Sequence, residues 1–347
     1  MTTKKTKAVC VPLTEAEPLR RSLRERNLLR EDLEIVKEGE CIYFPVKDVP
    51  DELCLYTVVT KSFELKAAKP HSYKDRLKLS KKLMVELPTS YDVVGAIILI
   101  KLPKTLFHYQ KEIGKALLAT HKNIQTVCLI APVSGELRTR NVTIIAGENQ
   151  TLTTYTEYGL SLHVDVKNTY FSPRLASERK RVADLVKPGE IVVDMFAGVA
   201  PFSIMIARYA KPRIVYAIDK NKEAIILAQQ NVKQNHVLNT VEVIHADAND
   251  VKNVVPTKAD RIIMNLPFSA YNFFSLALCI AAKICILHYY DILKEEDIET
   301  RIDALKKIAA EHDYILSDVL IRKIKTYAPR EFYIGIDITA TKHADVA

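Results

Sequence analysis

Tryptophan is absent from the 347 residues, only nine residues are glycine, and aromatic side chains make up just 7% of the chain. So little glycine, with no internal period of about 20 to 50 residues, argues against solenoids and propellers. No apolar run reaches the roughly 18 residues that a membrane helix needs, and the opening MTTKKTKAV lacks the apolar stretch of a secretory signal. We therefore expect a cytoplasmic protein that does not enter membranes.

Metal and disulfide signatures are also missing. None of the six cysteines forms a CxxC pair, and the nine histidines show no ligand spacing such as HExxH. Cys279 and Cys285 lie inside apolar runs, where a small core residue is the expected role. We predict no metal site and no disulfide framework, as is typical of a reducing compartment.

What the chain does have is a large apolar content and an excess of positive charge. The 48% of hydrophobic residues can bury one large core or two to three smaller ones. Fifty Lys and Arg against 42 Asp and Glu give a formal net charge of +8, which favours polyanionic partners, nucleic acid first among them.

The residue pattern divides the chain into three regions. Residues 1–68 combine short strands with a basic helix over 19–32, and residues 69–165 follow as an α+β region that we expect to bind RNA or link the domains. Residues 166–347 alternate apolar runs with helical stretches, which indicates an α/β doubly wound parallel sheet covered on both faces. Two closing strands joined at Pro329 predict an antiparallel hairpin at the sheet edge.

Candidate ligand residues stand where the apolar runs of this last region stop. In an open α/β sheet the ligand binds outside the carboxyl ends of the strands, and the four ends carry Asp194, Asp219, Asp247 and Asn265. Each alone is more often a turn residue or a helix cap, but four in register favour a cofactor that carries a nucleoside. Asp219 is placed for the ribose hydroxyls and Asp247 for the adenine amino group. The single Gly198 of the first turn does not make a dinucleotide fingerprint.

Three separated segments carry a family resemblance. The run DMFAGVAPFS, followed in order by Asp219, Asp247 and NLPF, resembles the class I S-adenosylmethionine methyltransferases. FSPRLASERKRV just before it, GELRTRNVTIIAGE and the closing YAPREFYIGIDI are similar to the tRNA (guanine-37-N1)-methyltransferase family of archaea and eukaryotes. The match covers about residues 70 to 342. Ala200 departs from it, because family members usually have a second glycine there, and the added methyl is expected to narrow the methionine pocket.

The resemblance implies a reaction and a set of roles. A methyl group would pass from S-adenosyl-L-methionine to N1 of guanosine 37 of tRNA, in an enzyme that we expect to be a monomer. Guanine N1 is a poor nucleophile until it loses its proton, so a general base and a group that stabilises charge on O6 are required. The resemblance implies that Glu178 is the general base, that Arg138 stabilises the charge on O6 and that Asn265 holds the edge of the base. In the alternative interpretation, Glu178 only pairs with Arg174, Arg179 or Arg181 on its own helix.

The remaining implied contacts concern the cofactor and the RNA. Tyr170 would stack on the flipped nucleotide, Arg140 and Arg174 would meet substrate, and Pro267 would stiffen the turn after Asn265. The implied cofactor-binding residues are Asp194, Phe196, Ala197, Gly198, Asp219, Lys220, Asp247, Ala248 and Asn265. By the same resemblance, the first region is expected to recognise the folded corner of tRNA.

Three other functions remain open on the sequence alone. A wyosine-pathway enzyme would move a methyl or aminocarboxypropyl group onto a modified guanosine 37 with the same cofactor and fold. A nicotinamide-dependent oxidoreductase would share the sheet, although the single Gly198 argues against it. A non-catalytic RNA-binding module with a vestigial crevice is the third.

Overall fold

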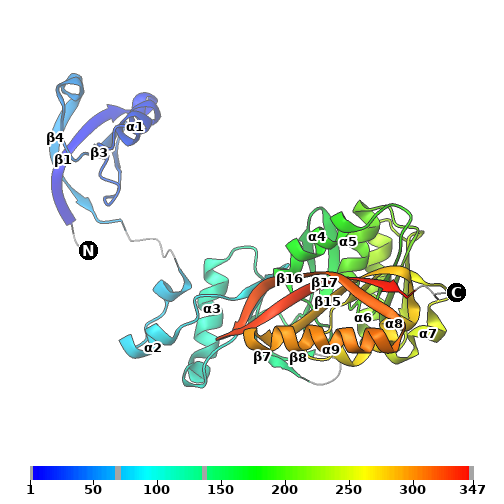
Figure 1. Cartoon of the computed structure of the whole chain (residues 1–347). Coiled ribbons are helices and arrows are strands. Elements are labelled where there is room, and N and C mark those ends of the chain that lie inside the picture. The colour runs from blue at the N-terminus through cyan, green and yellow to red at the C-terminus, as the bar shows by residue number, and fades with distance from the viewer. Residues whose placement is uncertain (1–2, 67–71, 135–138, 344–347) are drawn as a thin grey trace. The chain divides into compact units, whose positions relative to one another are not determined.

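Residues 3–66, 72–134 and 139–343 are described by the structure, a computed structural model (Figure 1). It contains two compact units, Met1–Asp75 and Arg76–Ala347.

The first unit is an antiparallel sheet that carries one helix. The strands lie in the order β2-β3-β1-β4. Their bounds are Thr3–Pro12 for β1, Val36–Glu38 for β2, Cys41–Pro45 for β3 and Thr57–Glu64 for β4. Helix α1 (Ala16–Glu25) buries Leu19 and Leu23 against this sheet. The predicted basic helix is real but shorter than expected, because Asn27, with φ of 54°, takes the left-handed conformation that terminates helices.

The second unit begins with a four-stranded mixed sheet, in the order β5-β6-β7-β8. The bounds are Asp92–Val94 for β5, Ile97–Ile100 for β6, Thr126–Ser134 for β7 and Thr139–Gly147 for β8, with helices α2 (Lys81–Glu86) and α3 (Gln110–Thr120). Helix α3 packs directly on β8, where a Cβ added at Gly114 would stand 2.8 Å from that of Ala146. Glycine therefore permits this close contact.

A hairpin, β9 (Leu152–Glu157) and β10 (Leu160–Asp165), connects this sheet to the larger one. Asn231 of helix α6 (Lys222–Gln234) and Asn235, which caps the carboxyl end of that helix, bond to the backbone edge of β10, with Asn231 Oδ1 accepting from the His163 N–H at 2.7 Å. Side-chain amides thus satisfy an edge that has no strand partner. Hydrophobic side chains on both sides of residue 165 share one core, and the division at that residue stays a prediction.

The larger sheet has seven strands, in the order β13-β12-β11-β14-β15-β17-β16. Strands β11 to β15 are parallel to one another, and β17 is antiparallel to β15 and β16. The bounds are Ile191–Asp194 for β11, Ile214–Asp219 for β12, Val241–His245 for β13, Ala259–Met264 for β14, Ala281–Lys294 for β15, Tyr314–Ala328 for β16 and Glu331–Lys342 for β17. This arrangement confirms the predicted α/β class and the hairpin at the sheet edge.

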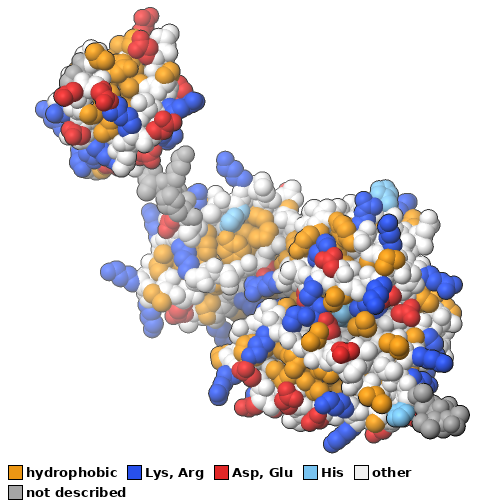
Figure 2. All heavy atoms as spheres, turned by 45° about the horizontal axis from the view of Figure 1, so that its top comes forward, with side chains coloured by type: hydrophobic (Ala, Val, Ile, Leu, Met, Phe, Trp, Pro, Cys, Tyr) orange, Lys and Arg blue, Asp and Glu red, His pale blue; other side chains and the backbone are white. Residues whose placement is uncertain are grey.

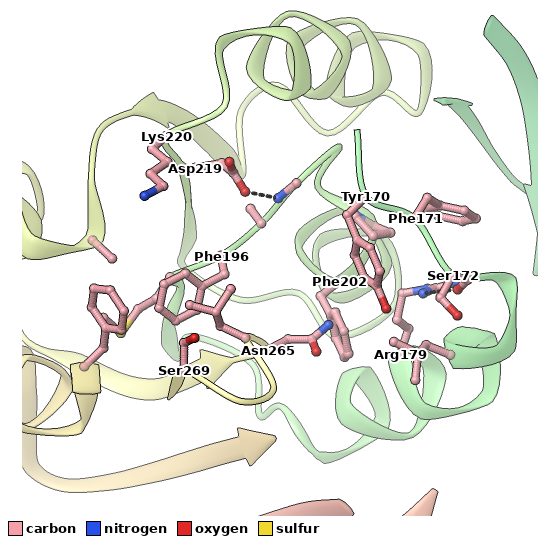
Figure 3. A pocket seen from close by; sticks show the side chains of 18 of the residues that line it. Tyr170, Phe171, Ser172, Arg179, Phe196, Phe202, Asp219, Lys220, Asn265 and Ser269 are labelled. Carbon is pink, nitrogen blue, oxygen red and sulfur yellow. Dashed lines mark hydrogen bonds between the residues drawn. The ribbon is translucent and has the colours of Figure 1, made fainter. Parts of the chain in front are cut away.

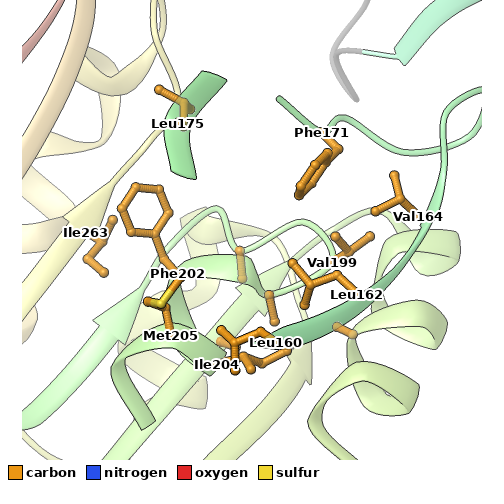
Figure 4. Close-up of a cluster of buried hydrophobic side chains, with 14 of the residues drawn as sticks. Leu160, Leu162, Val164, Phe171, Leu175, Val199, Phe202, Ile204, Met205 and Ile263 are labelled. Atoms are coloured by element: carbon orange, nitrogen blue, oxygen red, sulfur yellow. The ribbon is translucent and has the colours of Figure 1, made fainter. Parts of the chain in front are cut away.

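Helices cover both faces of this sheet. Helices α4 (Ala176–Leu185), α5 (Pro201–Tyr209) and α6 (Lys222–Gln234) share one hydrophobic cluster with the β9–β10 hairpin, part of which is drawn in Figure 4. Helices α7 (Val251–Val254), α8 (Phe274–Ile280) and α9 (Ile298–Glu311) share a second cluster on the opposite face. The strand order reverses between β11 and β14, and the carboxyl ends of the strands at such a reversal are where open α/β sheets bind ligands.

The surface does not by itself locate a binding site. Lys and Arg side chains are spread over the visible face of each unit, with Asp and Glu among them (Figure 2). Among the described residues, no three His, Cys, Asp or Glu side chains gather where they could hold a metal ion. Within the same ranges, no helix is both long and apolar enough to cross a membrane.

Candidate active site

A cavity of about 320 Å³ opens at the carboxyl ends of strands β11, β12, β13 and β14. The predicted strand ends meet there, as the parallel arrangement requires. Figure 3 shows residues from the separate strand ends and from the segment before α4 around one space. Of the implied cofactor residues, the lining includes Phe196, Ala197, Gly198, Asp219, Lys220, Asp247, Ala248 and Asn265.

The turn after β11 is held by the neighbouring strand. Gly198 has φ of 57°, and its N–H donates to Oδ2 of Asp219 at 2.7 Å (Figure 3). A Cβ added at Gly198 would stand 3.6 Å from the Tyr170 carbonyl oxygen. Because Gly198 has no side chain, its backbone forms this part of the cavity wall. Ala200 also has a left-handed φ, 63°, but it is fully buried in the hydrophobic cluster and does not line the cavity. The expectation that its methyl narrows the pocket is therefore not met.

Two carboxylates give this cavity its acidic side. Asp219 Oδ1 accepts from the Asn221 N–H at 2.8 Å, and burial raises the pKa of Asp219 despite its backbone hydrogen bonds. Asp247 accepts from the Asn249 backbone at 2.8 Å and lies 3.7 Å from Lys220 Nζ. Carboxylates with free lone pairs, placed beside aromatic walls, are suited to ribose hydroxyls and a base amino group.

Asp194 lies behind the cavity and is not part of its wall. Its side chain is 1% exposed; Oδ2 accepts from Ser203 Oγ at 2.9 Å, and within the part of the chain that the structure describes Oδ1 has no hydrogen-bond partner. Burial, with the Asp219 charge nearby, raises the pKa of Asp194 to about 7. This residue supports the loop from behind at an electrostatic cost.

Phe202 and Phe273, which the sequence analysis left without a role, join the predicted Phe196 in the lining of the first cavity. Phe196 and Phe273 meet edge to face with centroids 5.1 Å apart, and Phe202 lines the opposite side (Figure 3). Arg179, buried to 1% exposure, donates to Glu157 from Nε at 2.7 Å and to the Ser172 carbonyl at 3.2 Å. It thereby holds the segment before α4 against the cavity.

A second cavity, of about 740 Å³, adjoins the first and shares Tyr170, Ser172 and Ser269 with it. Its lining is aromatic and basic, and includes the predicted Tyr170, Arg174 and Pro267 together with Lys101, Phe268, Lys325, Tyr327 and Tyr333. Cations beside stacking surfaces are typical of sites that bind a nucleotide. In the first cavity Asp219 and Asp247 are balanced by Arg179 and Lys220, so the two cavities suit different ligands.

The wall of the second cavity is built from several chain segments that are far apart in sequence. Arg174 Nε donates to Asp92 at 2.6 Å. Phe268 has a left-handed φ of 73°, its N–H donates to Asp291 at 3.0 Å, and its ring meets Tyr327 of β16 edge to face at 5.5 Å. Strained, half-exposed aromatic residues of this kind cluster at ligand sites. Only the register of the hairpin brings Tyr327 here.

The predicted base, Glu178, is on α4 but does not line either cavity. It is 6% exposed, and its carboxylate accepts from Arg181 at 2.6 and 2.8 Å and from the Tyr290 hydroxyl at 2.8 Å. The alternative pairing with a same-helix arginine is thus present, with Arg181 as the partner. Arg138 lies outside the described residues, and Arg140 falls in β8 with an undescribed side chain.

Three family models match successive parts of the chain. They are the tRNA methyltransferase 5 N-terminal domain over residues 8–54, the TYW2 N-terminal domain over 73–151 and the TRM5/TYW2 methyltransferase domain over 153–317. Together they cover both units of the structure.

Individual relatives agree with these models. The tRNA (guanine(37)-N(1))-methyltransferase Trm5b of Pyrococcus abyssi is 39% identical over 334 residues, which cover 96% of this chain and 98% of that protein. The tRNA(Phe) (4-demethylwyosine(37)-C(7)) aminocarboxypropyltransferase of Methanocaldococcus jannaschii is 36% identical over 206 residues, which cover 59% of this chain and 81% of that protein. A solved complex of aTrm5 with tRNALeu matches with a TM-score of 0.79 and 34% identity, covering 96% of this chain and 99% of that one.

The resemblance that the sequence motifs indicated is confirmed by these matches. Two observations lead to the same conclusion. One relative is similar over nearly the whole of both chains, and the strand ends of the large sheet line one cavity. The chain belongs to the tRNA (guanine(37)-N(1))-methyltransferases of the TRM5/TYW2 family.

Proposed function

We propose that this protein transfers a methyl group from S-adenosyl-L-methionine to N1 of guanosine 37 of tRNA, next to the anticodon. The observation that carries the proposal is the junction of two adjoining cavities with different linings. The cavity at the strand ends, which holds Asp219 and Asp247, shares Tyr170, Ser172 and Ser269 with a second cavity whose lining is more basic. Donor and acceptor ligands bound in the two would meet at this junction.

The first cavity fits the donor. Asp219 and Asp247 offer acceptors for the ribose and the adenine amino group, and Gly198 lets the ligand lie against the backbone. Phe196 and Phe273 provide flat apolar walls for the purine. S-adenosyl-L-methionine supplies a methyl group on a positively charged sulfur, ready for direct transfer to a nucleophile.

The second cavity fits the guanosine. Tyr170 is positioned between both cavities and is our candidate to stack on the base, while Arg174 and Lys325 supply positive charge for the backbone. Asn265 holds the base edge, and Pro267 restricts the turn that follows. Arg140 is proposed to meet phosphate, and Arg138 to stabilise the charge that develops on O6.

We propose Glu178 as the group that takes the proton from N1. It stands between Leu175 and Arg179, both of which line the first cavity. Both carboxylate oxygens are bonded to Arg181 and one of them also to Tyr290, so Glu178 reaches the base only if tRNA binding opens part of this arrangement. Proton removal at this step contributes about 10²- to 10⁴-fold to rates in comparable enzymes.

Regions outside the site complete the proposal. The first unit, whose helix α1 carries Arg20, Arg21 and Arg24, is proposed to recognise the folded corner of tRNA. The sheet of β5 to β8 is proposed to help hold the anticodon stem. The enzyme is proposed to act as a monomer in the cytoplasm and without a metal ion, since the chemistry asks only for a base and hydrogen-bond donors.

The test uses labelled methyl donor and two tRNA transcripts that differ only in G37→A. Label on the G37 transcript alone supports the proposal, and equal label on both moves the target elsewhere. A nucleoside digest analysed by mass spectrometry then identifies N1-methylguanosine.

A wyosine-pathway activity is the second candidate. The match of residues 73–151 to the TYW2 N-terminal domain favours it. The first unit favours the leading proposal, because residues 8–54 match the tRNA methyltransferase 5 domain. Incubation with tRNA that already carries 4-demethylwyosine separates the two, since an aminocarboxypropyl product has a different mass from a methyl product.

A further inference from the structure

The hairpin at the edge of the large sheet sends one side chain to the strand end that carries Asn265. Tyr333 of β17 is 1% exposed, and its hydroxyl donates to Oδ1 of Asn265, 68 residues earlier in the chain. Tyr333 lines the second cavity and Asn265 lines the first. The bond therefore stands between the two proposed ligands.

The ring of Tyr333 is fixed from two sides. The Tyr290 ring packs on it with centroids 6.1 Å apart, and Lys325, its cross-strand neighbour on β16, places Nζ 5.2 Å from its centroid. Tyr290 is held in turn by its hydrogen bond to Glu178. Because these groups are packed together, the Tyr333 hydroxyl has one position, and a rotation of the Asn265 amide breaks its bond.

This contact decides which end of the Asn265 amide faces a ligand. With Oδ1 occupied by Tyr333, the group left to the cavity is Nδ2, which can only donate. Figure 3 shows the nitrogen of Asn265 on the side of Tyr170 and Phe202. A hydrogen-bond donor at this point can bind an acceptor atom of guanine, which is O6 or an unprotonated ring nitrogen. It cannot bind the amino group of the base, which is itself a donor.

We propose that Tyr333 is a positioning residue, which fixes the Asn265 amide so that its nitrogen meets an acceptor on the target base. The inference rests on the proposed function, because it assigns a substrate contact to Asn265. Tyr333 itself touches no reacting atom. Its effect on methyl transfer passes through Asn265 alone.

Tyr333→Phe tests this, because it removes the hydroxyl and keeps the ring packed between Tyr290 and Lys325. We expect the single-turnover rate of methyl transfer to G37 tRNA to fall about tenfold, as a loss of about 1.4 kcal/mol in the transition state implies. The dissociation constants of S-adenosylhomocysteine and tRNA should stay within about threefold of wild type. In an Asn265→Ala background, Tyr333→Phe should have no further effect on the rate.

Tyr314→Phe is the matched control for loss of a buried tyrosine hydroxyl. Tyr314 lies in the same hairpin, 5% exposed, and its hydroxyl donates to the Ala281 carbonyl at 2.9 Å, away from both cavities. This variant should lose stability like Tyr333→Phe and methylate tRNA at the wild-type rate. The comparison separates a general packing effect from positioning.

Each outcome decides a separate question. A Tyr333→Phe enzyme as fast as wild type overturns the inference, and so does a rate loss of the same factor with and without the Asn265 side chain. If wild type itself labels G37 and A37 transcripts alike, the proposed function fails first, and the positioning role falls with it.

Discussion

Replacing Asp194 by asparagine should make the stability of the second unit less dependent on pH between about pH 6 and about pH 8. The wild-type carboxyl is 1% exposed, has one oxygen without a hydrogen-bond partner and lies near the charge of Asp219. Burial is the main reason that its pKa rises from 3.8 to about 7. The asparagine has nearly the same shape, still accepts from Ser203 and carries no charge.

The direction in which stability changes with pH follows from this rise in the pKa of Asp194. The folded state holds the Asp194 proton more tightly than the unfolded state does, so the contribution to stability is complete below pH 3.8 and is lost as pH rises through about 7. The whole change in pKa corresponds to an upper bound of about 4 kcal/mol. Between about pH 6 and about pH 8 the wild type should lose about 1.4 kcal/mol that Asp194→Asn does not lose.

Hydrogen exchange followed by mass spectrometry suits this measurement, because the chain has no tryptophan and two separate units. The amides of β11, which contains Asp194, report the opening of the second unit. Asp303→Asn is the control, since that carboxylate is exposed and pairs with Lys306 at the surface. If the stability of Asp194→Asn differs from that of wild type by the same amount at about pH 6 and at about pH 8, the reasoning is refuted.

Three further predictions concern the site. Glu178→Gln should slow single-turnover methyl transfer by about 10²- to 10⁴-fold and leave S-adenosylhomocysteine binding intact. Glu190→Gln is the control and should not slow transfer, because it disturbs a Glu–Arg pair that lines neither cavity. Equal rates for the two variants would show that Glu178 is not the base. Ala200→Gly should leave the S-adenosylhomocysteine dissociation constant within about twofold in calorimetry, because the methyl group faces the core, and a clearly tighter complex would contradict this. Lys325→Gln should reduce the slope of log tRNA affinity against log salt concentration by about one, while Lys306→Gln leaves the slope unchanged. An unaltered slope in Lys325→Gln would mean that Lys325 does not contact a phosphate.

Much of the first cavity was predictable because it depends on local pattern. A parallel sheet collects the carboxyl ends of its strands at one edge, so residues such as Gly198, Asp219 and Asn265 are brought together once the strands are identified. Asp194 and Ala200 show what that pattern leaves open. Asp194 ends β11 and Ala200 lies in the turn that follows, but both are buried and neither lines the cavity, and sequence spacing does not reveal this.

The amino-acid sequence by itself determined the class of fold, the edge of the sheet where the ligand binds and the family of the enzyme. These depend on apolar periodicity and on short motifs whose residues are neighbours in the chain. Only the tertiary structure decided what completes the site. The pairing of β16 with β17 and of β17 with β15 sets which hairpin residues face the cavities, and a shift of one residue would turn Tyr333 to the opposite face. Contacts such as Tyr333 with Asn265 join residues far apart in sequence, so they exist only when the whole sheet has formed.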